Sequence, residues 1–406
     1  MRPLANRFHV VLAASVVAFC ALSAISQTSA LGGIAGEVRD STGAVVSGAT
    51  VVVTNTGTGS SRTLQTDSAG HYAASFLQPG TYEVVAGGGT FGKVDRKNIP
   101  VTVGDAVTVD ATLPNATVST EVVVSSDPPL LDTEKVAANQ VVSEALINNL
   151  PVNGRRFDNF VLATPNVVPD GSTGLISFRG ISGIYNSNLV DGANNNQAFF
   201  SEARGRSIGA PYVYPVDAIK EFSAENAGYS AEFGQAAGGI INAVTKSGTN
   251  KFHGDVYELY RTPGYNAIDS FTKTKPVKVQ HQFGVSVGGP VFRDKLFFHF
   301  TYDGYRKVTP ITYVSGYTLT PGQTLNDLTG LCDQRTSNFL TRGTAIYPSV
   351  IPGISATQCG AAVTYLKSQQ GAFPRNVNQN IYFPRLDYQL GSKTHLSASY
   401  LFQNFL

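Results

Sequence analysis

Apolar and polar residues alternate with a period of two along several stretches, as expected of β-strands with one apolar face. In the C-terminal part, this alternation predicts five strands, at roughly 252–263, 280–290, 295–307, 379–390 and 394–405. In the third, one face carries apolar side chains and the other polar ones, Leu296, Phe298, Phe300 and Tyr302 opposite His299, Thr301 and Asp303. Strands of about ten residues with this pattern are typical of outer-membrane barrels, although a soluble sandwich has the same alternation.

The connections between these strands differ in length. Residues 292–295 and 391–394 form short turns, whereas about 308–380 form one long connection. Short turns on one side and long loops on the other fit a membrane barrel. Five strands leave open edges, which lipid does not tolerate, because each unpaired backbone group costs free energy. We therefore expect residues 251–406 to begin a larger barrel, and the chain to be an N-terminal fragment.

The N-terminal part predicts a small domain of short strands. Tyr72, Ala74 and Phe76 share one face of such a strand, and turn signals recur about every ten residues between 32 and 113. This spacing is typical of a β-sandwich. In front of it, residues 1–30 read as a secretory signal peptide, with a basic start, an apolar run too short to span a membrane, and small residues at Thr28–Ala30.

The middle of the chain mixes helix and strand signals. Ser143 suits the N-cap of a short helix that ends before Pro151, and a second helix begins near Arg156 and ends before Pro165. Residues 135–250 are therefore expected to form an α+β domain. A Ser/Thr/Val-rich linker, 114–134, separates it from the sandwich.

Composition adds two limits. Lys+Arg 30 and Asp+Glu 28 give a net charge of +2, so charge does not indicate a nucleic-acid partner. Cys20 lies in the signal peptide, which leaves Cys332 and Cys359 as one possible pair in an exported chain. We expect them to form a disulfide, the alternative being two free thiols.

The order of motifs in 36–84, G-x-V-x-D, G-A-x-V-x-V, T-D-x-x-G-x-Y and L-x-P-G-x-Y-x-V, resembles the carboxypeptidase regulatory-like domain. Such modules are accessories of many secreted proteins, so the resemblance does not imply a peptidase. A peptidase would need closely spaced zinc ligands. The mature chain has five histidines, and none of them begins such a pattern. They are His71, His253, His281, His299 and His395. We expect no enzyme activity and no catalytic, cofactor or metal residues.

The middle domain resembles the plug of TonB-dependent receptors. The family pattern runs R-G, a strand that ends in D-G, an I-x-x-x-E-x segment, Y-G, and then G-G-x-I-N-x-x-T-K. The residues assigned to it here are Arg179, Gly180, Asp191, Gly192, Glu221, Gly238, Gly239 and Asn242. The sequence departs from the commoner pattern at Ala231–Gly234. Together with Leu150–Arg155 this is similar to the Oar-like subgroup, whose members also carry the regulatory-like module.

The resemblance implies an outer-membrane receptor for energy-coupled uptake. Its TonB box would be the segment Thr120, Glu121, Val122, Val123 and Val124, which would add as a strand to the TonB complex of the inner membrane. The alternative is that this segment is the last strand of the sandwich. Expected partners are outer-membrane lipid and a small ligand, a siderophore, glycan or peptide, and no nucleic acid.

Roles for the plug residues follow from their chemistry. Gly180, Gly192, Gly238 and Gly239 allow turns and close backbone approach. The charged residues Arg179, Asp191 and Glu221 are candidates for plug–barrel ion pairs, or are ordinary turn and surface residues. The alternative function for the whole chain is a secreted or surface adhesin that binds carbohydrate through the sandwich. Deleting Thr120–Val124 separates the two, since only a receptor needs that segment.

Overall fold

The computed structural model describes residues 30–89, 91–114, 122–124, 138–149, 156–170, 175–198, 212–229, 233–265, 267–268, 275, 279–313, 361, 365, 371–392 and 394–405. The chain divides into two compact units. One contains Met1–Tyr257, Phe283–Gly304 and Gln379–Phe405, and the other contains Glu258–Gln282 and Tyr305–Asn378. Several predicted features lie outside the described residues: the expected signal peptide up to residue 29, Thr120, Glu121, Leu150–Arg155, Cys332 and Cys359.

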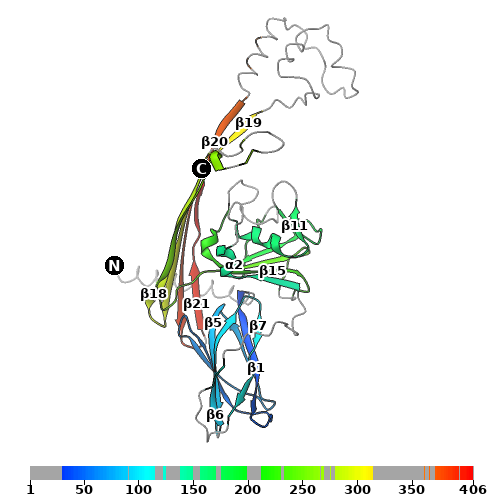
Figure 1. Cartoon of the computed structure of the whole chain (residues 1–406), viewed down its shortest axis with the longest axis vertical. Helices are drawn as coiled ribbons and strands as arrows, with labels where there is room; N and C mark the ends of the chain where they lie inside the picture. The colour runs from blue at the N-terminus through cyan, green and yellow to red at the C-terminus, as the bar shows by residue number, and fades with distance from the viewer. Residues whose placement is uncertain are drawn as a thin grey trace, which may run out of the picture. The chain divides into compact units, whose positions relative to one another are not determined.

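The N-terminal domain is a two-layer β-sandwich, blue and cyan in Figure 1. In one sheet β1 (Gly32–Asp40) pairs antiparallel with β4 (His71–Leu77) and parallel with β7 (Ala106–Thr108) and β8 (Ala111–Leu113). The other sheet has the order β3-β2-β5-β6-β9, where the strands span Ser61–Gln65, Thr50–Asn55, Gly80–Gly88, Phe91–Val101 and Val122–Val124.

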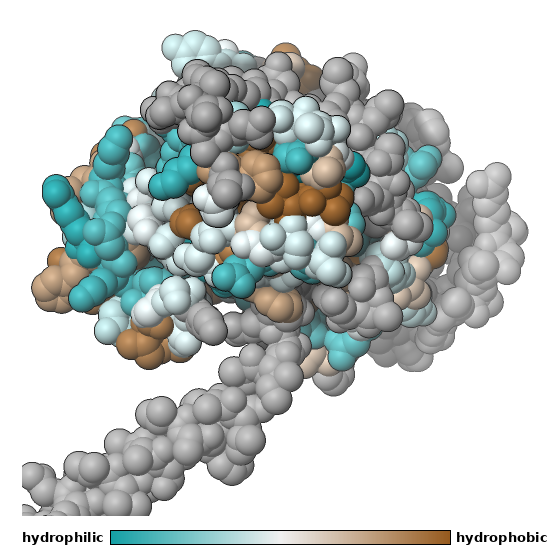
Figure 2. Space-filling view, turned by 90° about the horizontal axis from the view of Figure 1, so that it is seen from below, coloured by the Kyte–Doolittle hydropathy of each residue, from teal (hydrophilic) through white to brown (hydrophobic). Residues whose placement is uncertain are grey.

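The sandwich core lies between these sheets and is built by alternation. Val51 and Val53 are 0% and 1% exposed, and they pack with the buried side chains of the opposite sheet, among them Val38 and Tyr72. Figure 2 shows the chain from below, and on the coloured part of that face apolar residues form small patches among polar ones. The apolar side chains of this domain therefore gather mainly between its two sheets.

One prediction for this domain was wrong. Phe76 was expected on the same face as Tyr72 and Ala74, but its side chain is 56% exposed. The register of β4 against β1 shifts between Gly32 and Ile34, and Phe76 has φ 60°. This bulge reverses the alternation, so Leu77 is buried in place of Phe76.

The middle domain, here called the plug, is green in Figure 1. Its sheet has the order β10-β15-β16-β13-β14, with strands at Ala138–Val142, Ile219–Ala227, Ile240–Thr245, Ser187–Val190 and Ala193–Asn194. The hairpin of β11 (Val167–Asp170) and β12 (Leu175–Phe178) packs its apolar side on the same core. All six residues of β16 are buried, as expected of a central strand that is covered on both faces.

Short helices complete the plug. α2 (Glu144–Asn149) follows Ser143 and buries Ile147 in the core. The second expected helix is η3 (Phe157–Ala163), a 3-10 helix that buries Phe160 and Val161. Two further 3-10 turns, η4 (Gly183–Tyr185) and η5 (Val216–Ala218), were not predicted. In the part of the chain that the structure describes, no helix is both long and apolar enough to cross a membrane.

The C-terminal strands form an antiparallel sheet, here called the wall sheet, in the order β17-β18-β19-β20-β21. These strands span His253–Arg261, Val279–Phe292, Leu296–Tyr313, Gly371–Leu390 and Thr394–Ser399, and η6 (Pro263–Tyr265) follows β17. β22 (Phe402–Phe405) also pairs with β20, and the Tyr400 amide between β21 and β22 donates to Pro384 O at 3.0 Å. The predicted fold class is confirmed: a mainly β chain with a sandwich, an α+β plug and the strands of an incomplete barrel.

Candidate site at the junction of plug and wall

The wall sheet turns its polar face toward the plug. On β20, Phe383, Arg385 and Asp387 are 2%, 6% and 2% exposed, whereas Leu386 and Tyr388 between and beside them are 50% and 40% exposed. Successive side chains of a strand point to opposite faces, so the alternating sequence places Arg385 and Asp387 on one inward row. The cost of burying these charges has to be offset by their partners.

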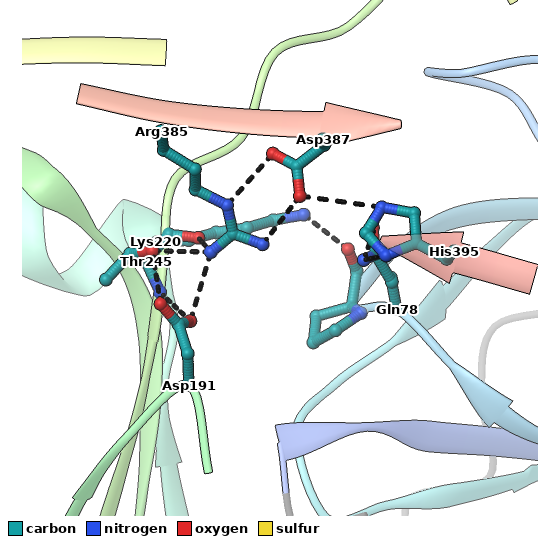
Figure 3. A network of polar contacts seen from close by, with 8 residues as sticks. Gln78, Asp191, Lys220, Thr245, Arg385, Asp387 and His395 are labelled. Atoms are coloured by element: carbon teal, nitrogen blue, oxygen red, sulfur yellow. Dashed lines mark hydrogen bonds and ion pairs between the residues drawn. The ribbon is translucent and has the colours of Figure 1, made fainter. Parts of the chain in front are cut away.

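Arg385 meets its neighbour on that row first. Its Nε donates to Asp387 Oδ2 and its Nη2 to Asp387 Oδ1, both at 2.9 Å. A guanidinium and a carboxylate match in this bidentate geometry, which is stronger and more directional than a single hydrogen bond. The third nitrogen, Nη1, remains directed at the plug (Figure 3).

Two plug residues receive that nitrogen. Nη1 of Arg385 lies 3.1 Å from Asp191 Oδ1 and donates to Thr245 Oγ1 at 2.5 Å. The Thr245 amide and hydroxyl donate to the two Asp191 oxygens at 2.9 and 2.7 Å. The Arg385 guanidinium is therefore shared. It binds Asp387 of β20 in the wall sheet, and in the plug it binds Asp191, which follows β13, and Thr245, which ends β16.

A tight turn positions Asp191. Leu189 pairs with Asn194 and Val190 with Ala193, which leaves Asp191-Gly192 as a two-residue loop. Asp191 has φ 50° and Gly192 φ 79°. Positive φ at both positions is the type I′ geometry that Asp-Gly favours, so the local sequence fixes this loop. It presents the Asp191 carboxylate at the end of β13.

The network continues from Asp387 to the sandwich. His395 Nε2 of β21 lies 3.5 Å from Asp387 Oδ1, and the His395 ring lies within 3.1 Å of Gln78 Nε2. Lys220 Nζ, beside this chain of contacts, donates to Pro79 O at 2.5 Å (Figure 3). Residues of all three structural parts thus meet within one polar cluster.

A second polar contact joins plug and wall. Tyr212 of the plug and Tyr257 of β17 both donate their hydroxyls to Asp303 of β19, which is fully buried. Gln379 Nε2 of β20 donates to the Tyr212 carbonyl at 2.6 Å. Both the side chain and the backbone of Tyr212 are therefore held by wall strands.

The other charged residues expected at this junction have different partners. Arg179 is exposed, and its Nη2 donates to Gly238 O at 3.1 Å within the plug. Glu221 accepts from the Val103 amide of the sandwich at 2.6 Å. Burial raises the pKa of Glu221 and lowers that of Lys220. The candidates for plug–barrel ion pairs were Arg179, Asp191 and Glu221. Among them, it is Asp191 that contacts a wall strand, through Arg385.

The four motif glycines divide into two kinds. Gly180 and Gly192 have φ of 80° and 79° and occupy turns. A Cβ at Gly238 would lie 2.2 Å from Asn186 Oδ1, and one at Gly239 would lie 2.4 Å from Phe178 Cγ. Asn242 is fully buried in β16, beside Ser223 of β15.

The structure describes Val122–Val124 of the TonB-box-like segment and places these three residues beside the sandwich. Val122, Val123 and Val124 form β9, which pairs parallel with Val94–Arg96 of β6. This pairing has the geometry of the alternative to a TonB box, in which the segment is the last strand of the sandwich. The role of Thr120–Val124 as a TonB box therefore remains a prediction.

The sequence alone did not single out Arg385, Asp387, Tyr212 or Asp303. Their available signal was weak: charged residues on the polar face of an alternating strand, R-x-D in β20 and an aspartate in β19. Alternation marked that face as inward, but it gave no indication of which plug residues lie opposite.

Comparison with known proteins identifies two domains in the chain. Residues 33–114 match the family model of the carboxypeptidase regulatory-like domain, and residues 244–406 match that of an outer membrane beta barrel domain. The TonB-dependent transporter Oar of Myxococcus xanthus is 28% identical over 256 residues, which are 58% of this chain and 23% of that protein. The chain thus spans about a quarter of the length of this curated relative.

Solved structures with similarity to the chain include two receptors. The siderophore receptor PirA from Acinetobacter baumannii is 19% identical, with a TM-score of 0.39 over 66% of this chain and 32% of that one. The ferric enterobactin receptor from Pseudomonas aeruginosa is 14% identical, with a TM-score of 0.43 over 66% and 33%. The chain therefore carries a carboxypeptidase regulatory-like domain followed by an outer membrane beta barrel domain, and over 58% of its length it is similar to a TonB-dependent transporter.

Proposed function

We propose that the chain takes part in energy-coupled uptake of a small ligand across the outer membrane, with the TonB complex of the inner membrane as its partner. The ligand would be a siderophore, a glycan or a peptide. Outer-membrane lipid would surround the outward row of the wall sheet, where Leu386, Tyr388 and Leu390 are 40–52% exposed.

The observation that carries the proposal is the shared guanidinium of Arg385. A plug that has to move needs a junction that can open and close again. Apart from Phe383, the facing row of β20 is polar at this junction, so parting the two surfaces exposes little apolar area to water. Arg385 and Asp387 remain paired with each other when Asp191 and Thr245 leave, so the buried charges of the wall keep their main partners.

The coupling segment supports the same proposal. Val122–Val124 pairs through its backbone with only one described neighbour, β6. A short strand at the edge of a sheet can exchange that neighbour for a strand of another protein. We assign this exchange to Thr120, Glu121, Val122, Val123 and Val124, with TonB as the acceptor.

The experiment deletes Thr120–Val124 from the full-length receptor in its outer membrane. Uptake of a panel of ferric siderophores, short glycans and peptides is compared with and without the deletion, and surface display is checked by antibody. The matched control deletes the five preceding linker residues, 115–119. We expect loss of uptake with normal display for the first deletion and retained uptake for the control. Equal uptake in both would refute the coupling role.

A binding measurement tests the partner directly. Val123→Pro removes a backbone N–H and disfavours strand pairing, whereas Val118→Pro makes the same change elsewhere in the linker. The purified C-terminal domain of TonB should bind the chain, lose affinity by tenfold or more for Val123→Pro, as expected when strand hydrogen bonds worth about 1–3 kcal/mol are lost, and keep its affinity for Val118→Pro. Equal affinity for both variants would exclude strand addition at Val123.

A further inference from the structure

The sandwich touches the plug at two adjacent strands. Val103 is central: its amide donates to Glu221 Oε1 at 2.6 Å, and its side chain clusters with Ala30 and Val244. Glu221 of β15 and Val244 of β16 are direct cross-strand partners. One residue of the sandwich therefore contacts both strands of the β15–β16 pair at the same level.

A bulge makes this contact possible. The register of β15 against β16 shifts between Ile219 and Glu221, so Lys220 is the extra residue. Neighbouring side chains of a regular strand point apart, and a bulge re-aims one of them. Lys220 can thus reach Pro79 O while Glu221 reaches the Val103 amide, two loops of the same domain.

A third contact lies where the plug joins the wall sheet. The Asn250 amide donates to Gly57 O at 2.9 Å. The Asn250 side chain donates to Asp294 Oδ1 at 2.7 Å and accepts from the Asp294 amide at 2.9 Å, in the turn between β18 and β19. The loop at Gly57 is thereby tied to the exit of β16 and to a turn of the wall sheet.

We propose that the sandwich is a clamp on the β15–β16 pair of the plug, and that it has to release Lys220 and Glu221 before this pair can move. The inference rests on the proposed function for its role in transport. The clamp itself is a property of the folded chain. The sandwich holds the pair through Val103, Pro79 and Gly57, and Arg385 holds the end of β16 through Thr245.

Burial explains why release has a cost and why it is reversible. Glu221 is 6% exposed, and its one described hydrogen bond to the sandwich is the Val103 amide. If the Val103 amide were lost while the sandwich stayed docked, the Glu221 carboxyl would be buried without this hydrogen bond, which costs free energy. Full undocking instead returns both Lys220 and Glu221 to water. The clamp is therefore stable when closed and separates into two hydrated charges when open.

The first test uses amide hydrogen exchange on the whole chain. Glu221→Ala removes the acceptor, and Glu221→Gln keeps an oxygen that can accept from Val103. The matched control, Glu37→Ala, removes a carboxylate whose ion pair is with Arg39 inside the sandwich. We expect exchange of the Val103 amide and of β15–β16 to accelerate about tenfold or more in Glu221→Ala, in line with the loss of a buried hydrogen bond. In Glu221→Gln and in the control Glu37→Ala, the same amides should exchange at rates near those of the parent.

The second test closes the clamp covalently. A Cβ built at Gly57 lies 3.9 Å from Thr249 Cβ, within the range for a disulfide. Gly57→Cys/Thr249→Cys should form this bond, slow exchange of β15–β16 about tenfold or more, and return to the parent rate when reduced. Each single variant serves as control. Unchanged exchange in both Glu221→Ala and the oxidised double variant would overturn the proposal.

The two proposals fail in different ways. Absence of energy-coupled uptake in the full-length receptor would remove the transport role and leave the exchange results intact. If uptake depends on Thr120–Val124 while the clamp variants exchange like the parent, the receptor function stands and the clamp is wrong. If both hold, the oxidised Gly57→Cys/Thr249→Cys receptor should lose uptake, and reduction should restore it.

Discussion

Asp191 of the plug and Arg385 of the wall sheet lie 3.1 Å apart, from Oδ1 to Nη1. The Asp191 side chain is 27% exposed and the Arg385 side chain 7% exposed. The wall residue is thus the more deeply buried of the two, and it has a second carboxylate, Asp387, on its own strand. Loss of the guanidinium should therefore be costlier than loss of Asp191.

Arg385→Ala should destabilise the chain strongly, because it leaves Asp387 buried without its ion pair. Removing one partner of a buried pair typically costs about 3–5 kcal/mol. Asp191→Asn should cost about 1–2 kcal/mol, since an amide oxygen can still accept from Thr245. Urea unfolding of the whole chain measures both. Arg293→Ala, on the exposed turn between β18 and β19, is the control; a cost for Arg385→Ala no larger than the control's would refute this assignment.

Gly239→Ala should disrupt the plug core. The added methyl carbon would meet the Phe178 ring at 2.4 Å, and overpacking of this kind costs about 1–3 kcal/mol. Gly234→Ala is the matched control, because nothing lies within 4 Å of its Cβ position. Hydrogen exchange of β16 amides measures the opening free energy. Phe178→Leu added to Gly239→Ala should recover part of the loss; no recovery would show that the contact with Phe178 is not the cause.

Gly180→Ala should destabilise for a different reason. Its Cβ position is open, but its φ of 80° is a conformation that costs an L-residue about 1–2 kcal/mol. Exchange of the β12 amides next to this turn should accelerate accordingly. Asn at position 180, which tolerates positive φ better than Ala, should recover part of the loss. Equal exchange for Ala and the parent would contradict a backbone origin.

The contact at Asp303 predicts a measurable coupling between plug and wall. Tyr212→Phe removes the plug's donor, and Asp303→Asn removes the charged acceptor. A double-mutant cycle should give a coupling of about 1–3 kcal/mol, as for hydrogen bonds to charged groups. Tyr257→Phe, which removes a donor within the wall sheet, is the comparison that leaves the plug contact in place. A coupling near zero for Tyr212 would show that this contact does not hold the plug.

The sandwich should lose stability in alkali. Burial, and then the nearby Asp110 carboxylate, raise the pKa of Tyr72, whose hydroxyl donates to Val109 O at 2.6 Å. A raised folded-state pKa gives stability that is present below the unfolded value of about 10 and is lost as pH rises above it. The free energy of unfolding of residues 30–114, which have their own core, should therefore fall by up to about 1.4 kcal/mol per pH unit from this group.

Tyr72→Phe tests that assignment. The variant should have a lower free energy of unfolding than the parent at pH 8, because the hydrogen bond to Val109 is lost. The difference in this free energy between parent and variant should narrow or reverse between pH 10 and 12. Tyr82→Phe should show the same trend, since burial also raises the pKa of Tyr82. A constant difference across this pH range would mean that Tyr72 does not titrate with unfolding.

Features that depend on neighbours along the chain can be predicted from the amino-acid sequence. Alternation placed Arg385 and Asp387 on the inward row of β20, because successive side chains of any strand point to opposite faces. Asp191-Gly192 specified a two-residue turn, because few residue pairs accept positive φ. The matched order of motifs was sufficient to predict a sandwich, a plug and a wall sheet of barrel type.

The contacts between residues that are distant in the sequence depend on how the strands and sheets pack. Asp191, Arg179 and Glu221 look equivalent as charged plug residues, yet they contact β20, the plug's own backbone and the sandwich, respectively. The bulges at Phe76 and Lys220 likewise depend on the register of paired strands, which no single strand encodes. Partner choice in a β protein is a property of packed sheets, since a long-range contact forms only after each strand has found its neighbour.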